Sequence, residues 1–291
     1  MQNEEDQLRL LRARRQVYFD AMILYIIQLF LLVVVPAGGA ILSIFAPEIR
    51  PGVALASIAV FVVDVLYLDR AIKSLLRKSA KIGEEFDHAT LSLPWNAFAV
   101  GEKVTPEEVH RYATAFAKRS DDIKLRDWYD RGVAKAPLAL GRIICQRINI
   151  GYDSRLRQVY SEIVRFGALS LIAVIVVLAF AMKLSLPSLA VAFVPALPVL
   201  SWSVREFFQQ RDTAAFLQSL ISKEEKLWDT AKSSAQEGKL LEDSRQLQDA
   251  IFLHRASAPL ILPPVYDLLR GQLEGEANSL VAARLKELCI S

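Results

Sequence analysis

The stretch AMILYIIQLFLLVVVPAGGAILSIF, residues 21–45, is apolar apart from Gln28 and the PAGG run at residues 36–39. A bilayer core of about 30 Å needs roughly 17 to 25 mostly apolar residues per helix. A secretory signal has an apolar region of only about 7 to 15 residues and a small-residue cleavage site, which is not clear here. We therefore predict that residues 21–45 form a retained transmembrane helix.

Three further runs have the same character. Residues 52–68 contain one charge, Asp64, and residues 166–182 and 184–202 contain none. These runs explain how 53% hydrophobic residues and a mean hydropathy of +0.28 coexist with 23% charged residues. One such run could be a buried core helix, but four in two short-looped pairs fit that reading poorly. The sequence predicts an all-α membrane protein with four transmembrane helices in two hairpins and a helical cytoplasmic domain.

Basic residues predict the orientation of these spans. Of the 35 Lys and Arg residues, only Arg50 and Lys183 fall in the turns inside the two hairpins. Because loops rich in Lys and Arg stay in the cytoplasm, the N-terminus, the middle segment and the C-terminal tail are expected there. Cys145 and Cys289 would then lie on the reducing side, where no disulfide is expected.

Five segments follow from these runs. We predict a cytoplasmic N-terminal segment (1–20), a first transmembrane hairpin (21–68) and a cytoplasmic helical domain (69–162). These are followed by a second transmembrane hairpin (163–204) and by a cytoplasmic helical stalk and tail (205–291) that packs on the helical domain.

The cytoplasmic segments show helical signals. Residues 68–86 lack Pro and are predicted to continue the second span as a helix. Thr105, Pro106 and Glu108 form a capping box with Pro at the first helical position, which predicts a helix over residues 105–118. Residues 97–104 are a weak strand candidate. A stalk over 205–234, a break near Gly238 and a last helix over 265–288 are expected in the tail.

Motifs of enzyme chemistry are missing from the sequence. The histidines and cysteines are scattered, and there is no H-E-x-x-H, C-x-x-C, G-x-S-x-G or Walker loop. We expect a protein that is not an enzyme and that has no metal or cofactor. A net charge of +3 without a dense basic patch argues against polymeric nucleic acid as a partner.

Gln28 and Asp64 are the polar residues singled out within the predicted spans. Asp64 lies about one turn from Asp69 and Arg70, near the cytoplasmic end of its span. It is read as an interfacial residue or as the partner of a nearby Arg, with a role in an ion pathway as the alternative.

A polar stripe marks the helix that Pro137 is expected to open. Arg142, Gln146, Asn149 and Asp153 follow the spacing of one helical face. With Arg147 nearby, this face could bind phosphate oxygens and base edges of a nucleotide. The alternative is a buried hydrogen-bond network with polar residues of the tail, namely Arg245, Gln248, Asp249, His254 and Arg255.

Five short motifs in order carry a resemblance to a known family. They are EFD at 85–87, LPWN at 93–96 with Val100-Gly101, LRDWY at 125–129, ICQR at 144–147 with Asn149, and LQD at 247–249 with Ile251, His254-Arg255 and Pro259. This ordered set resembles the SMODS-associating four-transmembrane effector family, and the resemblance, which includes the two hairpins around a cytoplasmic block, covers nearly the whole chain.

The resemblance implies a function in bacterial antiphage defence of the CBASS type. It implies an inner-membrane effector that senses a cyclic di- or trinucleotide, assembles into a homo-oligomer and permeabilises the bilayer, which kills the cell. The residues expected to bind the ligand are Trp95, Asn96, Arg142, Gln146, Arg147, Asn149, Gln248, His254 and Arg255.

Two other functions fit the same sequence. A membrane-anchored sensor or scaffold would leave bilayers intact and bind a cytoplasmic partner. A small transporter would conduct a solute, and Asp64→Asn should then abolish the flux.

Overall fold

The computed structural model describes residues 2–183, 185–233 and 237–290, and these residues form helices and connecting loops without a strand. The chain divides into two compact units. Unit 1 comprises Met1–Ala21, Lys73–Leu156 and Thr213–Ser291, and unit 2 comprises Met22–Ile72 and Arg157–Asp212. The all-helical prediction is therefore confirmed for the described part of the chain.

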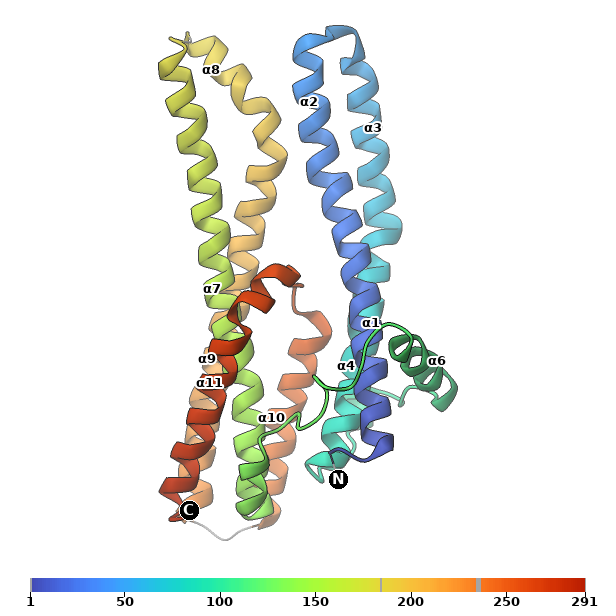
Figure 1. Cartoon of the computed structure of the whole chain (residues 1–291), viewed down its shortest axis with the longest axis vertical. Helices are drawn as coiled ribbons and strands as arrows, with labels where there is room; N and C mark the ends of the chain where they lie inside the picture. Colours follow the sequence, from blue (N-terminus) through green and yellow to red (C-terminus); the bar gives the residue numbers. More distant parts are fainter. Residues whose placement is uncertain (1, 184, 234–236, 291) are drawn as a thin grey trace. The chain divides into compact units, whose positions relative to one another are not determined.

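Unit 2 contains the apolar runs. Its complete helices are α2 (Val35–Phe45), α3 (Arg50–Val63) and α8 (Leu186–Phe193), and α2 packs against α3 (Figure 1). Within the described ranges, three continuous helical stretches are long and apolar enough to cross a membrane, namely Glu5–Leu42, Pro51–Thr90 and Leu138–Ala181. This finding supports the membrane character predicted from the sequence.

The fourth apolar run is not one regular helix. Helix α8 is followed by the 3-10 turn η5 (Val194–Ala196) and then by α9 (Leu197–Ser233). Pro195 and Pro198 lack the backbone N–H that a regular helix would use at these positions, which explains the change of helix type. Leu184, at the start of the predicted span, lies outside the described residues.

Two π-helical turns interrupt the other apolar helices of unit 2. The turn η1 (Phe30–Val34) links α1 (Glu5–Leu29) to α2 just before Pro36, which cannot donate a helical hydrogen bond. The turn η3 (Asp64–Leu68) links α3 to α4 (Asp69–Thr90) without a break. The prediction that the second span continues as a helix through residues 68–86 is therefore confirmed.

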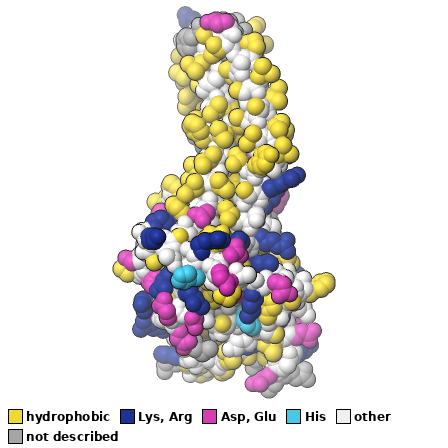
Figure 2. Space-filling view, turned by 90° about the vertical axis from the view of Figure 1, so that its right-hand side faces the viewer, with side chains coloured by type: hydrophobic (Ala, Val, Ile, Leu, Met, Phe, Trp, Pro, Cys, Tyr) yellow, Lys and Arg dark blue, Asp and Glu magenta, His cyan; other side chains and the backbone are white. Residues whose placement is uncertain are grey.

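The surface of unit 2 is apolar. Large hydrophobic side chains point outward along its helices; Leu55 is 69% exposed and Val177 is 65% exposed. Figure 2 shows hydrophobic side chains covering the helices of this unit, whereas charged side chains gather on unit 1. Such a surface suits a lipid environment, because aliphatic side chains exposed to water cost free energy in proportion to their area.

Unit 1 has a conventional hydrophobic core. It is built by the first half of α1, most of α4, the start of α7 (Leu138–Ala181), the end of α9, α10 (Glu237–Ser257) and α11 (Pro263–Glu287). Phe86, Ile144, Trp228 and Ile251 are among its fully or almost fully buried side chains. This core fixes the positions of the polar side chains described below.

Local signals account for the small helices of unit 1. Helix α6 (Pro106–Ala117) begins as predicted, with the Thr105 hydroxyl accepting from the Glu108 N–H at 3.4 Å. The Glu108 carboxylate does not complete the capping box, because it accepts from Lys78 Nζ at 2.7 Å instead.

The weak strand prediction for residues 97–104 is wrong. Helix α5 (Ala97–Val100) begins there because the Asn96 side chain accepts from the N–H groups of Phe98 and Ala99. It ends at Gly101, whose φ of +80° suits glycine.

The tail helices differ slightly from the prediction. Gly238, near which a break was expected, lies inside α10, and residues 234–236 of the expected break lie outside the described residues. Helix α11 has two prolines in its first turn, Pro263 and Pro264, where the missing N–H groups have no helical partner anyway.

Candidate functional site

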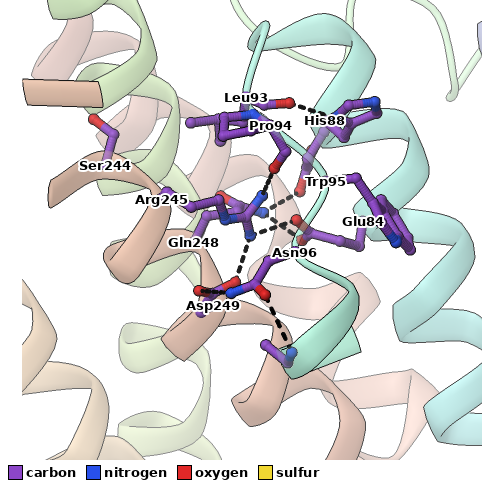
Figure 3. Close-up of polar contacts among 12 residues, drawn as sticks. Glu84, His88, Leu93, Pro94, Trp95, Asn96, Ser244, Arg245, Gln248 and Asp249 are labelled. Atoms are coloured by element: carbon purple, nitrogen blue, oxygen red, sulfur yellow. Dashed lines mark hydrogen bonds and ion pairs between the residues drawn. The ribbon is translucent and has the colours of Figure 1, made fainter. Parts of the chain in front are cut away.

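A network of charged and amide side chains lies inside unit 1 between α4 and α10 (Figure 3). Arg245 donates from Nη2 to Glu84 Oε1 at 2.7 Å and from Nη1 to the Pro94 carbonyl at 3.0 Å. Gln248 donates from Nε2 to Glu84 Oε2 at 2.9 Å. Glu84 is fully buried, so its charge depends on these partners for compensation.

Asp87 is the second buried carboxylate of this network. It accepts from Arg255 at 2.6 Å, from the Tyr129 hydroxyl at 2.7 Å and from Gln248 at 3.0 Å. Asn149 donates to the same Tyr129 hydroxyl at 2.8 Å. We call the groups around Glu84 and Asp87 the buried carboxylate network, since these two side chains collect donors from α10 and from Tyr129, which lies in the loop after α6.

The polar stripe of α7 contacts other parts of unit 1, and two of its residues, Gln146 and Asn149, belong to this network. Gln146 is fully buried and donates from Nε2 to the Ser244 carbonyl at 2.8 Å and to Gln248 Oε1 at 3.2 Å. Asp153, at the other end of the stripe, contacts His254 on α10. Arg142 donates to the carbonyls of Leu91 and Ser92 at 2.9 and 3.3 Å, which closes the C-terminal end of α4.

The LPWN loop is tied to the same helices. Asn96 donates to Asp249 Oδ2 at 2.7 Å while its oxygen caps α5, and Asp249 also contacts Arg245 at 2.9 Å (Figure 3). Trp95 donates to the Gly101 carbonyl at 3.1 Å. The loop is thus held at both of its predicted ligand-binding residues by bonds within the protein.

Arg147 belongs to a separate ion-pair cluster. It lies 3.1 Å from Glu224 on α9, and Arg284 of α11 lies 3.5 Å from the same carboxylate and 2.7 Å from Glu225. Burial raises the pKa of Glu224 to about 7, and the two arginines offset only part of that effect.

The structure therefore brings together most of the residues predicted to bind a ligand. The carboxylate network joins Asn96, Gln146, Asn149, Gln248 and Arg255, whereas Arg142, Arg147 and the His254–Asp153 pair have other partners. These contacts match the alternative reading of the stripe as a buried network. A role of these residues in ligand binding stays a prediction.

Sequence reasoning missed Glu84, Asp87 and Glu224. Glu84 and Asp87 stand three positions apart on a helix whose neighbours Ile82 and Phe86 are core residues. A carboxylate among core residues needs a buried partner, and this requirement was a signal that the sequence offered. The partners themselves could not be identified, because the arginines that pair with Glu84 and Asp87 lie more than 160 residues away.

The two polar residues of the predicted spans pair with each other in unit 2. Gln28 donates from Nε2 to Asp64 Oδ1 at 2.6 Å, and Asp64 is buried. A second polar contact in the unit joins Tyr25 to Glu206 at 3.3 Å, and Gln210 links Glu206 to Arg157. Among the described residues no arginine pairs with Asp64, and its observed partner is the amide of Gln28.

The family model of the SMODS-associating 4TM effector domain matches residues 1–283. The chain belongs to the SMODS-associating 4TM effector family. The resemblance inferred from the five motifs is thereby confirmed.

The chain is similar to a curated protein described as a probable CBASS effector molecule, from Bacillus cereus strain VD146. The two sequences are 23% identical over 294 residues, which cover 98% of this chain and 96% of the relative. No solved structure matches the chain.

Proposed function

We propose that this chain is a membrane effector of CBASS-type antiphage defence. Unit 1 senses a cyclic oligonucleotide in the cytoplasm, the protein self-associates, and unit 2 permeabilises the bacterial inner membrane, which kills the cell. The single observation that carries the proposal is the family match over nearly the whole chain. The curated relative's description as a probable CBASS effector supports it.

The surface of unit 2 supports the membrane part of the proposal. Three helical stretches are long and apolar enough to span a bilayer, and their large side chains face outward. We propose that α8 and the start of α9 form a fourth span, with both chain termini in the cytoplasm. The positions of the basic residues favour this orientation.

Continuous helices support a link between sensing and permeabilisation. Helix α7 contributes Leu138–Leu156 to unit 1 and Arg157–Ala181 to unit 2, and α9 also contributes to both units. A ligand that binds one arrangement of unit 1 more tightly shifts the population toward it, by no more than the difference in affinity. An unbroken helix can pass such a rearrangement to the apolar segment, whereas a flexible linker would lose it.

Self-association follows from the size of one copy. Four spans in a single chain enclose too little space for an aqueous path, because side chains fill the interior of such a bundle. Several copies are needed to surround a pore or to disrupt the bilayer over a wide area.

The proposal is tested with purified full-length protein in dye-loaded liposomes. We expect dye release when one member of a panel of cyclic di- and trinucleotides is added, and no release with linear dinucleotides. Constant leakage without nucleotide, or intact liposomes with the whole panel, would contradict the proposal. Intact liposomes together with tight nucleotide binding would identify a membrane-anchored sensor.

A further inference from the structure

A groove runs between the end of α9 and α10 in unit 1. Its volume is about 410 Å³, within the range of roughly 300 to 1,000 Å³ that is usual for small-molecule sites. Leu227 of α9 and Leu247 of α10 belong to its apolar lining, and Lys223, Lys226, Lys239 and Asp243 supply its charges. We call this feature the lysine groove.

The spacing of these residues places them on two facing helical surfaces. Lys223 and Lys226 are three positions apart on α9, and Lys239 and Asp243 are four positions apart on α10, so each pair lies on one face of its helix. The α9 side of the groove is therefore positive, the α10 side carries one ammonium group and one carboxylate, and the lining as a whole has three ammonium groups against one carboxylate.

In the part of the chain that the structure describes, the lysines of the groove differ from many other cations of unit 1 because they have no ionic partner. Lys78 pairs with Glu108 at 2.7 Å, and Lys232 pairs with Glu287 at 2.9 Å. Within the described residues, Lys223, Lys226 and Lys239 form no ion pair or side-chain hydrogen bond. All three ammonium groups are exposed and available to an anion from solution.

This combination suits a ligand with both phosphate and apolar parts. Lysine ammonium groups bind phosphate oxygens as point charges, and several of them around one ligand act together. Leu227 and Leu247 are 8% and 6% exposed, so they offer the face of a nucleobase the edge of an apolar floor. A cyclic nucleotide presents at least two phosphodiesters beside two bases, which matches the three amines and the apolar floor.

We propose that the lysine groove is the binding site for the cyclic oligonucleotide, and that the polar stripe of α7 serves to hold unit 1 together. This inference rests on the proposed function and names the site for its signal. Ligand seated in the groove contacts α9, the same unbroken helix that contributes residues to unit 2. Binding between α9 and α10 thus acts directly on one of the helices that can transmit a rearrangement.

The test measures nucleotide binding by full-length protein in phosphatidylcholine nanodiscs. The probes are cyclic di-AMP, cyclic di-GMP, 3′,3′-cyclic GMP–AMP and cyclic tri-AMP, titrated by calorimetry. The groove variant carries Lys223→Ala, Lys226→Ala and Lys239→Ala. The matched control carries Lys118→Ala, Lys124→Ala and Lys286→Ala, three exposed lysines outside the groove, so both variants change the net charge equally.

We expect the groove variant to bind the active probe about 100-fold more weakly. Each charge-assisted bond contributes on the order of tenfold in affinity, and solvent screening reduces the combined effect of the three lysines. The control variant should bind like the unmodified protein, and a Lys→Arg version of the groove should retain binding. Thermal unfolding should be the same for all variants, since these lysines make no internal contacts.

Two results would overturn the inference in different ways. If the groove variant binds the active probe as tightly as the unmodified protein does, the site lies elsewhere while the proposed function stands. If the unmodified protein binds none of the four probes, the groove is not a cyclic-nucleotide site, and the sensing part of the proposed function fails with it.

Discussion

The two units of the molecule differ most in the side chains that they expose. Unit 1 buries carboxylates such as Glu84 and Asp87 and surrounds them with arginine and amide donors. Unit 2 turns aliphatic side chains outward and has few internal polar contacts, among them the Gln28–Asp64 pair. The difference indicates that the buried charges of unit 1 specify one packing of its helices. The outward aliphatic side chains of unit 2 instead suit a lipid environment.

The largest effect is expected from Asp87→Ala in unit 1. The change leaves the guanidinium of Arg255 and the Tyr129 hydroxyl without their buried acceptor. Removing one partner of a buried ion pair costs about 3 to 5 kcal/mol, so we expect a large fall in the midpoint of thermal unfolding in detergent.

The control for this change is Asp267→Ala on α11, where the carboxylate is exposed. Its unfolding midpoint should match that of the unmodified protein. An Asp87→Ala variant as stable as this control would show that the buried network does not hold unit 1 together.

A smaller effect is expected for the pH dependence of unit 1. Because the pKa of Glu224 is raised to about 7 in the folded protein, the folded state binds the proton more tightly than the unfolded state. Its stabilising contribution is complete below pH 4.5 and is lost as the pH rises through about 7; the total is about 3 kcal/mol, of which about 2 kcal/mol is lost between pH 5 and pH 8.

Glu224→Gln removes this titration. Compared with the unmodified protein, the variant should lose about 2 kcal/mol less stability between pH 5 and pH 8, as measured by tryptophan fluorescence during denaturant unfolding. Identical pH profiles for the two proteins would contradict the assignment of the raised pKa to Glu224.

Arg142→Ala is expected to act on stability in unit 1. The side chain donates to the carbonyls of Leu91 and Ser92 at the end of α4, and these acceptors would be left without it. We expect a loss of about 1 to 2 kcal/mol and unchanged affinity for nucleotide in the protein that folds. Normal stability with lost binding would instead support the ligand-binding reading of the polar stripe.

The smallest effect is expected in unit 2. Gln28→Leu removes the 2.6 Å bond to Asp64, and hydrogen bonds between membrane helices contribute about 0.6 kcal/mol on average. The stability of the unit in detergent should change by about this amount, as measured by steric trapping. A loss as large as that of Asp87→Ala would remove the contrast between the two units.

Much of the fold could be predicted from local signals in the sequence. Apolar runs identified three of the helices suited to a bilayer, and Thr105 with Pro106 identified the start of α6. The short helix α5 was missed because it depends on the side chain of Asn96 accepting from the next turn. Such a cap is visible only once the backbone is known.

The site was less predictable because its contacts are distant in sequence. The face of α7 with Arg142 and Gln146 was identified from its periodicity, but helical spacing does not show whether a polar face meets solvent or protein. Glu84 and Arg245 are 161 positions apart, and only the packing of α4 on α10 joins them. The lysine groove likewise exists only where α9 and α10 meet.

The measurement that tests the contrast most directly is labelling of exposed positions in liposomes. Phe98 of unit 1 and Val177 of unit 2 are both exposed, at 101% and 65%. Each is replaced by Cys in a protein whose own cysteines are removed, and a membrane-impermeant maleimide is added to both faces of the bilayer. We predict rapid labelling of the Phe98→Cys protein and labelling of the Val177→Cys protein only after detergent. Rapid labelling of both proteins in intact liposomes would contradict the account.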